Sequence, residues 1–360
     1  MRDLDVLLVF GGIVPRRKVA RAMELINSLY KQSESEYYLD VEFMVELKAT
    51  TFFWLTHLAD LATYDVKFSV TIWGVDVAPY IRLVPEEIPL RTNVRALTQK
   101  GIGMIGVLNE EYLDHGVPPD RQEVFLRETS RAYQEVATGL CLAAGFYSPA
   151  VNERVEFLSH VFHKTYPGLA ENSPGLFDRI DHWAKVKMGE AERGALDLIQ
   201  FWLRTRDDLL LVMKEMSVRA LGLDITSPHT AASQGHEVTR RFYGPLFAPL
   251  LGGIAASHLD RYGSALGYAI GLRDVTSLAL RRGADGRLAD TRVSIRTPPG
   301  VQLLLAVPQL LSAVSASQRF QRDRIQVAAE ILGVGRRTNE VAWGQAKSAL
   351  LGIVDLISFV

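Results

Sequence analysis

The first third of the chain alternates between strand-like and helix-like patterns. Residues 5–10 are a short β-branched run that ends at two glycines, and residues 16–31 carry apolar side chains at helical spacing. The patterns that follow predict a strand at 39–48, a helix at 51–63, a strand at 66–73, a helix at 91–100 and a strand at 102–108. Because such alternation is typical of α/β layer structures, we expect residues 1–116 to form an α/β domain.

The rest of the chain is patterned mainly for helices. Apolar side chains recur every three or four residues between 118 and 223, and again from residue 301 onward. Residues 240–280 are rich in small apolar side chains, which suit closely packed helices. We therefore expect a larger, mainly α-helical region that consists of a helical domain at 117–300 and a helical C-terminal segment at 301–360.

The strand at residues 39–48 has the clearest pattern in the chain. Two sets of side chains alternate along it: Leu39, Val41, Phe43, Val45 and Leu47 on one parity, and Asp40, Glu42, Met44, Glu46 and Lys48 on the other. Successive side chains of a strand point to opposite faces, so one face is apolar and the other is mainly charged. The charged face ends in an acid and a lysine at adjacent positions.

This ending, Glu46-Leu47-Lys48, resembles the acid-x-lysine motif of the restriction-endonuclease-like nucleases. The predicted helix, strand, helix and strand that follow it are similar in order to the core of that superfamily, and the resemblance covers about a third of the chain. It implies that Glu46 binds Mg²⁺ and that Lys48 positions the attacking water and offsets charge on the phosphate.

The resemblance also implies a second carboxylate ligand on a neighbouring strand. Asp40, a further catalytic candidate, lies about 20 Å from Glu46 along one straight strand, so the two cannot share a metal unless the chain bends. Asp5 and Asp76 are the other donors that we consider. The alternative interpretation is an edge strand with a solvated charged face, on which Glu46 and Lys48 neutralise each other.

Residues 324–343 resemble the helix-turn-helix of bacterial and archaeal DNA-binding proteins. Ala329 corresponds to the small residue where the two helices cross, and Gly333 to the left-handed turn residue. The resemblance departs from the pattern at Asn339, where an aliphatic residue is usual. The alternative is a helix that ends at a glycine cap and is followed by another packed helix. Three residues would open the recognition helix and contact DNA: Arg336, Arg337 and Thr338.

Charge and composition limit the classes of function. The formal net charge is −1 and the isoelectric point is near 6.7, which argues against a general polyanion-coating role and requires any nucleic-acid contact to be a local basic patch. The single cysteine, Cys141, excludes an internal disulfide and lies in an apolar run, so we expect a buried, unreactive thiol. Without a signal-peptide pattern or an apolar span, we expect a cytoplasmic protein with no membrane partner.

Two further groups of polar residues are candidates for chemistry. Glu156, His160 and His163 fall on one side of a predicted helix, at a spacing that could present three ligands to a metal, although a solvated helix face has the same spacing. The pair Asp207 and Asp208 resembles an isoprenoid-synthase acidic pair only superficially, and we place it near a helix start.

The sequence therefore favours a metal-dependent nuclease that acts on DNA, with Mg²⁺ as its cofactor. One alternative is a non-catalytic helix-turn-helix regulator that binds DNA without cleaving it. The other is a self-assembling structural protein, suggested by the apolar run at residues 350–360, and a homo-oligomer is expected in that case.

Overall fold

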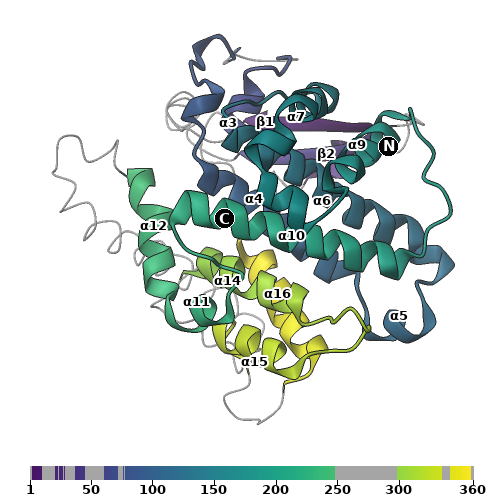
Figure 1. The fold of residues 1–360 in the computed structure, drawn as a ribbon. Coiled ribbons are helices and arrows are strands. Elements are labelled where there is room, and N and C mark those ends of the chain that lie inside the picture. The colour runs from purple at the N-terminus through teal and green to yellow at the C-terminus, as the bar shows by residue number, and fades with distance from the viewer. Residues whose placement is uncertain are drawn as a thin grey trace.

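Helices dominate the described part of the chain in the computed structural model (Figure 1). The structure describes residues 2–9, 21–22, 24–26, 28, 37–44, 61–71, 76, 78–247, 298–334 and 341–357. The strands are β1 (Arg2–Val9) and β2 (Tyr37–Met44). The α-helices are α3 (Leu61–Val66), α4 (Leu90–Val107), α5 (Glu110–His115), α6 (Gln122–Ala143), α7 (Val151–Thr165), α8 (Pro167–Asn172), α9 (Leu176–Met188), α10 (Leu198–Leu221), α11 (Pro228–Ser233), α12 (Gly235–Phe247), α14 (Pro299–Ser312), α15 (Arg322–Ile331) and α16 (Trp343–Ile357). Short 3-10 turns lie at Ala78–Tyr80, Pro85–Glu87 and Pro119–Arg121.

The prediction of an N-terminal α/β domain was wrong. The predicted helix at 91–100 and all but the last residue of the predicted strand at 102–108 lie in one continuous helix, α4. The predicted strand at 66–73 is not formed where it is described, because α3 ends at Val66 and a turn follows. What remains of the predicted sheet is a parallel pair, β1 with β2.

The run at 102–108 was misread because it is apolar on every side. A short apolar run does not by itself distinguish a strand from a buried helix. In α4 the buried side chains Val94, Leu97, Met104 and Ile105 follow helical spacing straight through Gly101. The helix is buried because α6, α10, α14 and α16 all pack against it.

One hydrophobic core runs from α4 to α16. Trp202 is fully buried on α10, and its indole N–H donates to the Met104 carbonyl of α4 at 3.0 Å. The middle of α14 is buried on all sides, as expected for a helix that is apolar all round. The domain boundaries at residues 116 and 300 stay predictions, and the core includes residues from both sides of each.

None of the helices in the described ranges combines the length and apolarity needed to cross a membrane. The apolar C-terminal run is accounted for in part by the core, since Leu350 and Ile353 of α16 are buried in it. Trp183 and Trp343, like Trp202, are buried.

Close packing of α4 against α14 makes a testable prediction at Gly101. A methyl group there would lie 2.6 Å from Cγ1 of the fully buried Val307, so Gly101→Ala overpacks the contact between the helices. We expect the free energy of unfolding to fall by about 1–2 kcal/mol, after allowance for the better helix propensity of alanine.

Gly106, on the same helix, is the matched control. Its added methyl group would meet only Leu351, at an ordinary 3.9 Å, so Gly106→Ala should raise the free energy of unfolding by about 0.5–1 kcal/mol. Urea denaturation of both variants measures the difference. Equal effects at the two glycines would contradict the packing of α14 on α4.

Candidate functional site

The residues that carry the two family resemblances lie largely outside the described part of the chain. Glu46 and Lys48 follow the end of β2, and the expected recognition-helix residues lie within the interval 335–340. The nuclease motif and the DNA-contacting residues Arg336, Arg337 and Thr338 therefore stay predictions.

The structure brings two of the candidate carboxylate residues into register. β1 and β2 run parallel, and Asp5 is the Cα partner of Asp40 in the ladder. Asp76 has a different role, because its exposed carboxylate accepts from the Thr71 hydroxyl at 3.0 Å and from the Ala78 N–H at 3.2 Å in a local turn. Among the described residues no group of three His, Cys, Asp or Glu side chains is arranged to hold a metal.

The segment that resembles a helix-turn-helix is described on both sides of its centre. α15 ends at Ile331, and Gly333 has the left-handed backbone (φ 75°) that the motif predicts. The next described helix, α16, begins only at Trp343, after the non-helical Val341 and Ala342. Its inner face packs against α4, α14 and α15, so its buried side chains are part of the core.

The candidate metal ligands on α7 form a solvated face. Glu156, His160 and His163 are all exposed, whereas Leu158 and Phe162 on the opposite side are buried. No group of three such side chains among the described residues, this one included, is arranged to hold a metal ion.

Cys141 is buried, as predicted. Burial raises the pKa of its thiol to about 12, and the thiol lies 3.4 Å from the Arg154 carbonyl, to which it donates. It therefore stays protonated at neutral pH and is a poor nucleophile.

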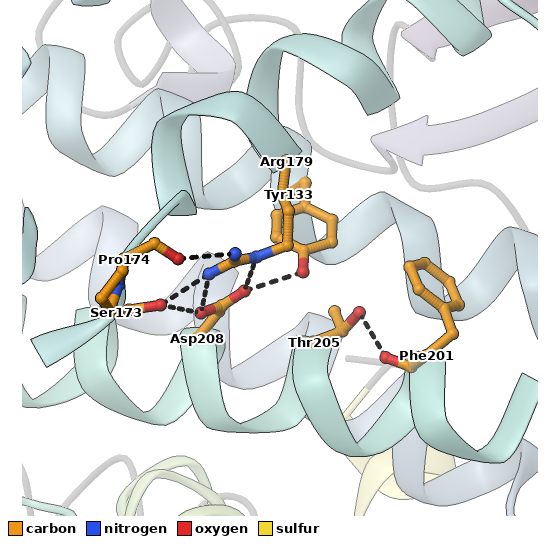
Figure 2. A network of polar contacts seen from close by, with 7 residues as sticks. All are labelled: Tyr133, Ser173, Pro174, Arg179, Phe201, Thr205 and Asp208. Atoms are coloured by element: carbon orange, nitrogen blue, oxygen red, sulfur yellow. Dashed lines mark hydrogen bonds and ion pairs between the residues drawn. The ribbon is translucent and has the colours of Figure 1, made fainter.

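The strongest polar network in the described structure centres on Asp208 of α10, which is 2% exposed (Figure 2). Arg179 of α9 donates from Nε and Nη2 to the two carboxylate oxygens, at 2.7 and 2.9 Å. The hydroxyls of Tyr133 on α6 and Ser173 before α9 donate to the same carboxylate, at 2.8 and 2.5 Å. Arg179 also donates to the Pro174 carbonyl at 3.0 Å.

This network holds helices together and leaves no capacity for chemistry. Four donors occupy the carboxylate of Asp208, which has about four acceptor positions. Burial and the adjacent carboxylate raise the pKa of the Tyr133 hydroxyl, so it remains a donor at any physiological pH. The network joins α6, α9 and α10 at one point, and we infer that it is structural.

Sequence reasoning placed Asp208 wrongly. It is in the middle of α10, and the helix begins ten residues earlier at Leu198, just after Asp197, whose side chain accepts from the N–H groups of Ile199 and Gln200 at 3.0 and 3.1 Å. One signal could have located it: Asp208 falls at helical spacing from the buried Trp202 and Thr205, on the apolar stripe. An acid on such a stripe needs a buried partner.

Cationic side chains gather in a shallow groove between α6 and α9. Arg127 and Arg131 lie one turn apart on α6, and Lys187 and Arg193 come from α9 and from the connection to α10. Glu128 lies 3.2 Å from Arg127 and 3.9 Å from Arg131, which helps to hold the two guanidinium groups in place. The other residues that line the groove are Glu123, Leu126, Ser130, Gln134, Trp183 and Val186.

A larger pocket of about 440 Å³ adjoins this groove. Glu123, Leu126 and Arg193 line both, and the carboxylate of Glu123 pairs with Arg193 at 2.6 Å where they meet. The pocket is bounded by the start of α6, the connection at 189–197 and the start of α10. Its remaining lining is Gly116, Val117, Gln122, Gly194, Leu196, Asp197, Leu198 and Ile199.

No family model, curated protein or solved structure matches this chain. The Asp208 network is closed to solvent and saturated, whereas the groove and its pocket are open to ligands. The groove is therefore the candidate functional site. Arg127 and Arg131 could be recognised in the sequence as neighbours on one helix face, but the residues opposite them could not.

The Asp208 network predicts a large loss of stability on a near-isosteric change. Asp208→Asn leaves Arg179 half-buried without its counter-ion, and we expect the free energy of unfolding to fall by about 3–5 kcal/mol in urea denaturation. Asp181→Asn on α9 is the control, since Asp181 forms an exposed pair with Lys185 at 2.6 Å. That change should stay within about 0.5 kcal/mol of the parent. Similar losses of unfolding free energy for the two variants would show that the Asp208 network does not hold α6, α9 and α10 together.

Proposed function

We propose that the protein binds nucleic acid, with DNA as the partner, through the basic groove between α6 and α9. The observation that carries this proposal is the gathering of four cationic side chains from three segments, against the two carboxylates of Glu123 and Glu128, in a chain whose net charge is −1. A local basic stripe of this kind is the electrostatic feature by which a phosphate backbone is held.

The hollow of the groove holds only about 60 Å³, so a phosphate backbone would lie along its lining side chains and not inside it. The lining residues of α6 run from Glu123 to Gln134, a span of about 16 Å on a helix. A stacked strand has one phosphate per roughly 3.4 Å, so four to five phosphates could lie along it. Arg127 and Arg131 are only about a quarter exposed and are braced by Glu128, so little side-chain freedom is lost on binding.

The arginines of the groove should control the affinity for DNA and the salt dependence of that affinity. We expect the double variant Arg127→Gln with Arg131→Gln to bind a fluorescent oligonucleotide at least about tenfold more weakly. The slope of log affinity against log salt should become shallower by about 1.4–1.8, because two phosphate contacts are lost. Fluorescence anisotropy across a salt series measures both quantities.

The matched control removes the same charge elsewhere. Arg82 and Lys164 are exposed and do not line the groove, so Arg82→Gln with Lys164→Gln should leave the slope unchanged. Glu123→Gln should act in the opposite direction and tighten binding, since Glu123 repels phosphate and occupies Arg193. Equal weakening by the groove and control variants would contradict the groove as the binding surface.

A metal-dependent nuclease is the second candidate function, and one observation favours it. β1 and β2 are parallel neighbours, and Asp5 is the Cα partner of Asp40, so the ladder places the two residues on adjacent strands. Carboxylate oxygens are the ligands that Mg²⁺ prefers, and the resemblance to nucleases implies two acidic ligands on neighbouring strands. Glu46 and Lys48 lie outside the described residues, and Glu46 would share a metal with Asp40 only if the chain bends between them.

This second candidate predicts cleavage that needs a divalent cation. With Mg²⁺ or Mn²⁺ the protein should cut a DNA substrate, and Asp5→Asn or Asp40→Asn should lower the rate about a hundredfold or more. Asp76→Asn should keep the rate, because that carboxylate is engaged in its local turn. A gel assay in which neither metal supports cleavage removes the nuclease and leaves DNA binding untouched.

A further inference from the structure

The cations of the groove are each held by a partner in the fold. The two arginines of α6 lie beside Glu128, and Arg193 pairs with Glu123 at 2.6 Å. Lys187, in the last turn of α9, donates from its ammonium to the side-chain carbonyl of Gln134 on α6 at 3.0 Å. This last contact crosses the groove, because Gln134 and Lys187 line it from different helices.

The position of Gln134 on α6 is set by buried contacts next to it. Its neighbour Tyr133 is 1% exposed and belongs to the Asp208 network, and the Gln134 backbone carbonyl accepts from the Thr138 hydroxyl at 2.9 Å. Gln134 and Lys187 are themselves partly buried. The amide is therefore carried by a backbone that cannot shift without disturbing the network that joins α6, α9 and α10.

A hydrogen bond to a neutral acceptor orders a lysine without offsetting its charge. The stem of lysine is long and flexible, so an ammonium that is already ordered loses less freedom when it binds a phosphate. A carboxylate at position 134 would also order the ammonium, but it would offset the charge that attracts the phosphate. The amide of Gln134 therefore favours a phosphate contact at Lys187 in a way that a glutamate would not.

We propose that Gln134 is a positioning residue for DNA binding, which holds the Lys187 ammonium at the α9 edge of the groove for contact with a phosphate. The inference rests on the proposed nucleic-acid binding and goes beyond it, because Gln134 carries no charge and acts through Lys187. A change at Gln134 should therefore lose its effect on the affinity for DNA when Lys187 is absent.

A double-mutant cycle tests this inference on the full chain, with a fluorescent DNA duplex and anisotropy as the readout. Gln134→Met keeps the length of the side chain and removes the amide, and we expect it to weaken binding about two- to fivefold. In a Lys187→Met background the same change should alter the affinity by less than about 1.5-fold. Gln200→Met, at an exposed position of α10 outside the groove, is the matched control and should leave the affinity unchanged.

A second variant, Gln134→Glu, separates positioning from a general loss of packing. Its carboxylate should pair with Lys187 and remove one phosphate contact, so the slope of log affinity against log salt should become shallower by about 0.7–0.9. Gln134→Met should keep the slope, because Lys187 retains its charge. In the Lys187→Met background, Gln134→Glu should leave the slope unchanged. Urea denaturation of each variant shows that it is folded under the conditions of the binding measurement.

The outcomes separate the role of Gln134 from DNA binding itself. If Gln134→Met weakens binding equally with and without Lys187, or in neither background, the positioning role is overturned and nucleic-acid binding by the groove stands. The same holds if Gln134→Glu and Gln134→Met give the same salt slope. A parent protein that binds no DNA overturns the proposed function, and this inference falls with it.

Discussion

A buried carboxylate cannot stay charged in a protein interior unless donors surround it, and this constraint fixes how α6, α9 and α10 meet. Asp208 receives its donors from each side: Tyr133 from α6, Arg179 from α9 and Ser173 from the segment before α9. No one of these helices can shift along another without leaving a charge unpaired. The Asp208 network therefore determines the geometry of every surface that the three helices form together.

The groove is such a surface, and its walls are set by the same contacts. Tyr133, which belongs to the Asp208 network, lies between Ser130 and Gln134 on α6. The network is therefore one helical turn or less from the groove. At the α9 end, Lys187 donates to the Gln134 side chain at 3.0 Å, and at the other end Arg193 pairs with Glu123 at 2.6 Å. The buried Asp208 network and the open groove are thus held by the same helices, although they share no residue.

How much of this was predictable depends on the range of the interactions concerned. The helices between 118 and 223 and the inert Cys141 followed from local pattern. The prediction of an α/β domain failed because α4 is buried by helices that are distant in sequence, among them α14, some two hundred residues away: a methyl group at Gly101 would strike Val307. The sequence could not predict the groove for the same reason, because Arg127 and Lys187 come to line one groove only when the chain folds.

The net charge shows a similar limit on what the sequence predicts about function. A value of −1 argued against a general polyanion binder, and that argument holds for the surface as a whole. At physiological salt, however, charges interact over about 8 Å, so a ligand in the groove is governed by the side chains that line it. Four cations and two carboxylates, Glu123 and Glu128, then outweigh the many distant charges that set the total. Where charged residues are placed by the fold, and not their sum, decides which partner a nearly neutral protein can hold.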